Sequence, residues 1–72
     1  MGYLRVKTPR TFMPGDVIMG RLNMPKREVP LTVLEAPRVV NGMSRVGVKV
    51  RESGAQLVWV VVDLHYMVES ER

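Results

Sequence analysis

His65 and Asp63 come closest to a catalytic pair in this chain of 72 residues. An imidazole beside a carboxylate can act as a general base. The alternative is a surface or capping role, which is commoner for a lone histidine in a turn between strands. The sequence has no nucleophile elbow and no glycine-rich phosphate loop, and its acidic residues are scattered. We therefore expect no enzymatic activity.

Metal and disulfide chemistry are not expected either. The chain has no cysteine and a single histidine, which excludes a disulfide framework, a thiolate zinc site and a histidine-based metal site. We expect no cofactor and no small-molecule substrate. A domain of this size is marginally stable, so hydrophobic burial, with or without self-association, must hold it together.

The basic side chains are concentrated in one part of the chain. Residues 1–51 hold ten basic and three acidic residues and carry +7, whereas residues 52–72 hold one basic and four acidic residues and carry −3, which gives the net charge of +4. A cationic surface attracts anionic partners and speeds their arrival, with nucleic acid as the obvious candidate. The alternative is that these are ordinary solubilising charges.

The composition favours strands, because fourteen valines stand against two alanines and β-branched side chains suit a pleated sheet better than a helix. We expect turns at Pro14-Gly15-Asp16 and Ser53-Gly54 and a loop from Asn23 to Pro30. A helical or 3-10 turn is expected from Asp63 to Tyr66, before the last strand. The expected strands are Tyr3–Lys7, Val17–Leu22, Leu31–Ala36, Ser44–Glu52, Leu57–Val62 and Met67–Glu69.

Asn41-Gly42 is the strongest hairpin signal in the sequence. Both residues tolerate the positive φ of a type I′ turn, which joins two antiparallel strands through two residues. Such a turn places Arg38 opposite Arg45 and, if the pairing continues, Leu34 opposite Lys49.

This register gathers basic residues on one face of the sheet. The cluster comprises Arg38, Arg45, Lys49 and Arg51, with Lys26 and Arg27 in the preceding loop as further contributors. Like charges opposite one another are unfavourable, so the cluster either is tolerated by solvent or marks a site that an anion completes. Pro37 cannot donate to a ladder, and a bulge there would shift the register.

The strict alternation from Ser44 to Glu52 predicts a half-buried strand. Its valines, Val46, Val48 and Val50, form the core face. A two-residue turn at Ser53-Gly54 pairs these valines, in order, with Val61, Trp59 and Leu57. Trp59 is therefore expected in the core rather than as a stacking platform for bases.

Three further valines, Val58, Val60 and Val62, then point outward beside the basic row. A plain solvated sheet does not present such a strip. We expect the strip to be covered by the Tyr3–Val6 strand or, alternatively, by another protein chain.

The order of these segments resembles that of the SH3-like small-barrel superfamily over roughly residues 15–69. The segments that carry the resemblance are Gly15-Asp16-Val17-Ile18, Leu31-Thr32-Val33-Leu34, Val46-Gly47-Val48-Lys49-Val50, Leu57-Val58-Trp59-Val60-Val61-Val62 and the Asp63–Tyr66 turn into Met67-Val68-Glu69. The resemblance implies a small antiparallel barrel of about five short strands. Members of this superfamily include peptide-binding modules and nucleic-acid-binding barrels.

We therefore expect an all-β, single-domain protein over residues 1–72, with residues 1–14 as an N-terminal extension or strand. No apolar run is long enough to span a bilayer and no secretory signal is recognisable, so we expect a soluble, cytoplasmic protein. The expected function is non-enzymatic binding of an anionic partner, first of all nucleic acid, through the basic face. The alternative is a protein-interaction module, such as a phage or mobile-element accessory protein, that binds a host protein or self-associates through the outward valines.

Overall fold

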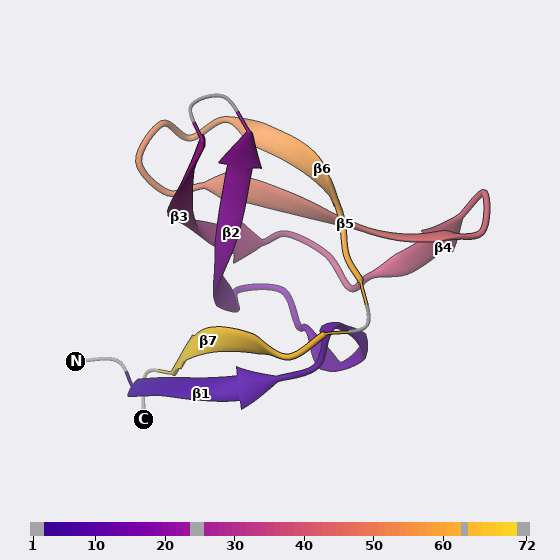
Figure 1. Ribbon diagram of the computed structural model, residues 1–72, viewed down its shortest axis with the longest axis horizontal. Helices are drawn as coiled ribbons and strands as arrows, with labels where there is room; N and C mark the ends of the chain where they lie inside the picture. Colours follow the sequence, from indigo (N-terminus) through magenta and orange to yellow (C-terminus); the bar gives the residue numbers. More distant parts are fainter. Residues whose placement is uncertain (1–2, 24–25, 63, 71–72) are drawn as a thin grey trace.

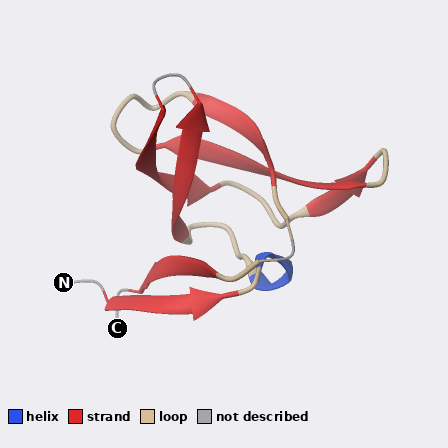
Figure 2. Cartoon of the chain, viewed as in Figure 1, coloured by secondary structure: helices blue, strands red, loops and turns tan. Residues whose placement is uncertain are grey.

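Antiparallel strands make up most of the computed structural model, which describes residues 3–23, 26–62 and 64–70. Within these ranges the chain forms seven strands and one 3-10 turn (Figure 2). The strands are β1 (Tyr3–Lys7), β2 (Val17–Asn23), β3 (Lys26–Val33), β4 (Arg38–Val40), β5 (Met43–Val50), β6 (Gln56–Val60) and β7 (Tyr66–Ser70), and the 3-10 turn η1 is Pro9–Thr11. The expected all-β class is confirmed, with seven strands rather than about five. None of the described segments is a helix of the length and apolarity needed to cross a membrane.

The strands form one curled sheet, a half-barrel, in the order β1-β7-β2-β3-β5 (Figure 1). β4 and β6 both pair with β5, but on opposite sides. The C=O of Gly47 accepts a hydrogen bond from the N–H of Leu34 at 2.8 Å on the β3 and β4 side, whereas the C=O of Ser44 accepts from the N–H of Val61 at 3.0 Å on the β6 side. β3 and β4 therefore lie end to end along β5, and the β4–β5 hairpin projects from the rest of the sheet.

The core lies on the inner face of the curled sheet. As expected, Val46, Val48 and Val50 of β5 are buried. Trp59 is partly buried against this core and makes an edge-to-face contact with Tyr66, with 5.5 Å between ring centroids. The other buried apolar residues are Phe12, Ile18, Val29, Leu31, Val33, Val61 and Val68.

Local turn chemistry behaves as the sequence predicts at two places. Asn41 and Gly42 have φ values of 53° and 75°, so the β4–β5 turn has positive φ at both central residues, as type I′ requires. Arg38 lies opposite Arg45 in the resulting ladder. The Pro14-Gly15-Asp16 turn is also present, with φ 95° at Gly15.

The expected loop from Asn23 to Pro30 is wrong. Lys26 begins β3, which pairs with β2 from Asn23 opposite Lys26 to Val17 opposite Thr32. Pro30 is tolerated within β3 because pairing with β5 starts only at Leu31, so the missing N–H falls at the end of that ladder.

The predicted register between β3 and β5 is also wrong. Thr32, not Leu34, lies opposite Lys49. The backbone leaves the strand conformation between β3 and β4, and this irregular segment, which includes Pro37, shifts β3 by two residues relative to the β4–β5 pairing.

The register between β5 and β6 also differs from the predicted one, because the connection between the two strands is longer than expected. The N–H of Val50 donates to the C=O of Ala55 at 2.8 Å, so four residues, not the two of Ser53-Gly54, connect the strands. Trp59 therefore lies opposite Val46, and Leu57 lies opposite Val48. The core face of β5 is unaffected, because a shift of two residues preserves the face.

The 3-10 turn occupies a different place from the one expected. Leu64 and His65 are not helical, Tyr66 already belongs to β7, and Asp63 lies outside the described residues. The 3-10 turn is instead η1, where Pro9 supplies a fixed φ at the first position.

Asp16 joins β1 to the start of β2. Its Oδ2 accepts hydrogen bonds from Nζ of Lys7 at 2.6 Å and from the N–H of Met13 at 2.9 Å, and its side chain is 13% exposed. Burial raises the pKa of Asp16, but these hydrogen bonds and the charges of Lys7 and Arg5 outweigh it, so the pKa lies below its ordinary value.

We predict that Asp16→Asn destabilises the protein at pH 7 by about 1.5–3 kcal/mol, the range for hydrogen bonds to a charged group. Because the folded-state pKa is lowered, the stabilisation is complete above the unfolded-state pKa, about 3.9, and is lost as the pH falls through the folded-state pKa. Urea denaturation between pH 2 and pH 7 should show the parent and the variant converging in acid. Glu28→Gln, at an exposed position, is the control; a pH-independent difference for Asp16→Asn would contradict the prediction.

We also predict that Gly20→Ala destabilises the protein. A Cβ at Gly20 would overlap Cδ1 of Leu31 and lie 3.0 Å from its Cγ, and Leu31 is fully buried. Overpacking of this kind costs about 1–3 kcal/mol. Gly47→Ala is the matched control, since its Cβ would meet Glu35 only at 3.5 Å. Equal midpoints for the two variants in urea denaturation would show that Leu31 can move aside.

Candidate binding surface

The outer face of β5 and β6 carries both kinds of residue that the sequence analysis singled out. Because Val46, Val48 and Val50 are buried on the inner face, the alternate residues of β5 must point outward. These are Arg45, Gly47 and Lys49, and they lie opposite Val60, Val58 and Gln56 of β6, respectively. We call these six residues the outer face.

Arg38 of β4 extends the outer face, opposite Arg45. A carboxylate moderates this like-charge pair, because Oε1 of Glu35 lies 3.4 Å from Nη2 of Arg38. The same side chain lies over Gly47, where a Cβ would be 3.5 Å from its Cγ. Glu35, which belongs to the irregular segment between β3 and β4, thus lies over the outer face between Arg45 and Lys49 and lowers the positive potential there.

Arg45 and Lys49 have no carboxylate partner within ion-pair distance in the described part of the chain. Lys49 is exposed between Thr32 and Gln56. Arg45 is partly buried, and its Nε is buried without a hydrogen-bond acceptor among the described residues. An unpaired buried N–H is unfavourable by about 1–3 kcal/mol, which a turn of the guanidinium toward an incoming acceptor would relieve.

The other basic residues of the predicted cluster lie elsewhere. Arg51 binds Oε2 of Glu69 in β7 at 2.5 Å, and Arg27 forms an ion pair with Glu52 in the β5–β6 loop. Lys26 is exposed at the end of the β2–β3 hairpin, opposite Asn23. The structure thus brings together three of the six basic residues, Arg38, Arg45 and Lys49.

The outward valines are uncovered within the described chain. Val58, Val60 and Val62 are 69%, 39% and 51% exposed. The expectation that the N-terminal strand covers them is wrong, because β1 pairs with β7 at the opposite end of the sheet.

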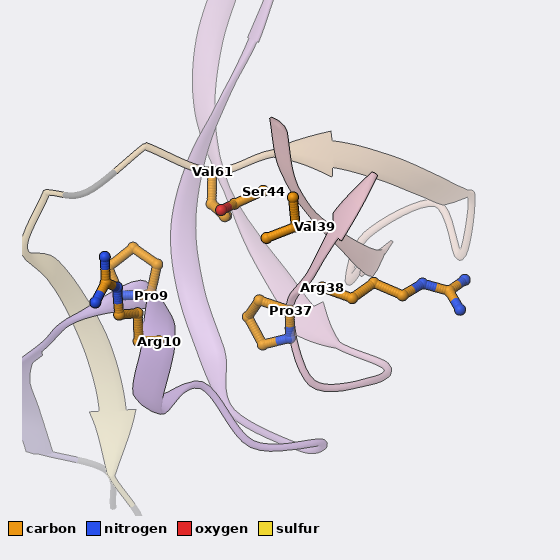
Figure 3. Close-up of a pocket in the computed structure, with 7 residues that line it drawn as sticks. All are labelled: Pro9, Arg10, Pro37, Arg38, Val39, Ser44 and Val61. Atoms are coloured by element: carbon orange, nitrogen blue, oxygen red, sulfur yellow. The ribbon is translucent and has the colours of Figure 1, made fainter. Parts of the chain in front are cut away.

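A groove of about 320 Å³ lies between η1 and the β4–β5 hairpin (Figure 3). Its walls are Pro9, Arg10, Pro37, Arg38, Val39, Ser44 and Val61. Figure 3 shows the side chain of Arg38 directed away from the groove, so Arg10 is the cation on its rim. Sequence reasoning missed this groove, because its two walls are about thirty residues apart in the chain and meet only in the folded protein.

His65 is exposed, and its proposed partner Asp63 lies outside the described residues. Across residues 3–23, 26–62 and 64–70, no three His, Asp or Glu side chains are grouped closely enough to bind a metal ion.

Comparison of the chain with models of protein families, with curated proteins and with solved structures gave no match.

Proposed function

We propose that the protein is a non-enzymatic binding module that engages an anionic partner, first of all nucleic acid, through the outer face. The observation that carries the proposal is the pair formed by Arg45 and Lys49, which lie four residues apart on one face of β5 and form no ion pair with a carboxylate in the described chain. Phosphate oxygens are suitable acceptors for both side chains, and such contacts position a nucleic acid without reading its sequence.

The strand order supports an SH3-like barrel as the scaffold of this module. β2, β3, β5 and β6 follow one another in the sheet, and β7 returns to pair with β2 at Val17 and Ile18. The resemblance implies a small antiparallel barrel of about five short strands, and in this proposal those strands are β2, β3, β5, β6 and β7. In this scaffold β1 is an addition to the edge of β7, and β4, with the first residues of β5, is an extension.

Weak sequence preference is part of this proposal. Trp59 packs against the core, so the outer face offers no large aromatic ring for stacking on bases. Recognition would therefore depend on phosphate contacts, with Val58 and Val60 in contact with the sugar edges.

A second candidate is a protein-interaction module that uses the outward valines. The observation that favours it is the exposure of Val58 and Val60 on β6 and of Val62 just after it, since β1 does not cover them. Fully burying a valine is favourable by about 1.5 kcal/mol or slightly more, so three of them could anchor a weak complex.

We predict that nucleic-acid affinity falls steeply with salt and depends on Arg45 and Lys49. Two or three phosphate contacts give a log–log slope of roughly −2 to −3, because each contact releases counterions. In gel-shift titrations with DNA and RNA, Arg45→Glu combined with Lys49→Glu should abolish binding. Arg10→Glu combined with Lys26→Glu changes the net charge equally and should reduce binding far less. Equal loss in the two double variants would contradict a site on the outer face.

We predict that Val60→Lys separates the two candidates by the sign of its effect. Val60 lies opposite Arg45, so the new cation should strengthen nucleic-acid binding severalfold at low salt. The same change should weaken a complex that buries the valines, because a lysine cannot be buried there without a partner. Affinities from fluorescence anisotropy for nucleic acid and from calorimetry for a protein partner measure the two effects. A decrease in nucleic-acid affinity would count against the first candidate.

A further inference from the structure

One edge of β6 has no partner in the described chain. β6 pairs with β5 alone. Two hydrogen bonds fix the direction of the backbone groups next to β6. Ala55 accepts from the N–H of Val50 in β5, and Val61 donates to the C=O of Ser44 in β5. The odd-numbered residues from Ala55 to Val61 therefore direct their backbone groups toward β5. By the alternation of an antiparallel ladder, Gln56, Val58 and Val60 direct their N–H and C=O groups away from β5. These six groups form a free edge.

This edge lacks the features that usually prevent strands from pairing between molecules. Natural edge strands carry lysine, proline or a bulge. The segment Gln56–Val62 contains no charged residue, no proline and no glycine, and four of the five residues of β6 are exposed. The opposite edge of the sheet, β1, carries Arg5 and Lys7, and β4 is only three residues long.

We propose that β6 pairs antiparallel with β6 of a second copy, about a two-fold axis at Val58. This inference rests on the second candidate function and names its partner. In this register Val58 lies opposite its own copy and Gln56 lies opposite Val60 of the copy, so the free groups of all three residues form six hydrogen bonds. A register centred on Trp59 would use only Val58 and Val60 and would form four. Such a two-fold interface is self-complementary by symmetry.

The charges around the edge do not oppose a second copy. β6 itself is uncharged, so its copy brings no like charge directly opposite. Arg45 and Lys49 lie on β5, one strand further away. β5 and its copy are then three strand spacings apart, about 14 Å, which exceeds the Debye length of about 8 Å at physiological ionic strength.

The pairing would also change the outer face. Val58, Val60 and their copies would form one apolar strip at the centre of a continuous sheet, and an Arg45 and Lys49 pair would lie on each side of it. Two cationic pairs held at a fixed spacing bind a long polyanion more tightly than either pair alone, because the second contact is intramolecular.

Cysteine cross-linking tests the register directly, because the chain has no cysteine of its own. At a hydrogen-bonded antiparallel pair the Cα atoms are about 5.5 Å apart, within the range for a disulfide. Under mild oxidation Val58→Cys should form a covalent dimer at least tenfold faster than Val39→Cys, whose parent residue on the β4–β5 hairpin is equally exposed at 70%. Equal cross-linking rates would overturn the proposed pairing.

Val58→Pro tests the hydrogen bonds of the edge. Its lost N–H points away from β5, so the β5–β6 ladder keeps all its bonds. Sedimentation equilibrium should show a dimer for the parent and for Val58→Thr, which keeps the N–H, and a monomer for Val58→Pro. A parent that is monomeric up to millimolar concentration, or a Val58→Pro variant that remains dimeric, would overturn the inference. If Val58→Pro does not fold, the sedimentation mass of the parent and the cross-linking rates of the cysteine variants still decide whether β6 pairs with its copy.

These outcomes are separate from those of the proposed function. A monomeric parent that still binds nucleic acid through Arg45 and Lys49 would reject the dimer and keep the first candidate. A monomeric parent that binds a different protein through the outward valines would keep the second candidate and reject a second copy as its partner.

Discussion

Burial of the inner face of β5 is the constraint on which the rest of the structure depends. Without disulfides, a chain of 72 residues must obtain its stability from a continuous apolar core, and Val46, Val48 and Val50 all belong to that core. Because side chains alternate along a strand, this burial forces Arg45 and Lys49 to the opposite face. The candidate binding surface is thus a direct consequence of how the core is made.

The carboxylates decide which cations remain available on the surface. Exposed ion pairs such as those of Arg51 with Glu69 and of Arg27 with Glu52 contribute only about 0–1 kcal/mol each to stability. Their larger effect is on the distribution of charge, because they neutralise cations that lie outside the outer face. The chain is basic overall, and Arg45 and Lys49 form no ion pair in the described fold, although the carboxylate of Glu35 lies beside Gly47 between them.

Both candidate functions use the same two strands, which makes them compatible rather than exclusive. The cations are on β5, and the outward valines lie on β6 or just after it, so a partner that covers the valines need not cover the cations. The unpaired edge of β6 connects the two candidate functions. A sheet extended across that edge would bury part of the apolar strip and leave the cationic positions of both copies facing solvent on one surface.

The sequence by itself determined the elements that depend on neighbouring residues. The β1 strand, the Asn41-Gly42 hairpin and the inward valines of β5 could all be predicted, because turn chemistry and side-chain alternation act over a few residues. Only the tertiary structure decided the register of β5 against β3 and β6, the strand that runs through Pro30, and the carboxylate partners of the basic residues. These depend on segments far apart in the chain, where an irregular stretch before β4 and a four-residue connection after β5 shift the pairing by two residues each. Such shifts preserve the face of every side chain but change its neighbours, and so the sequence could predict which residues point outward but not what they lie beside.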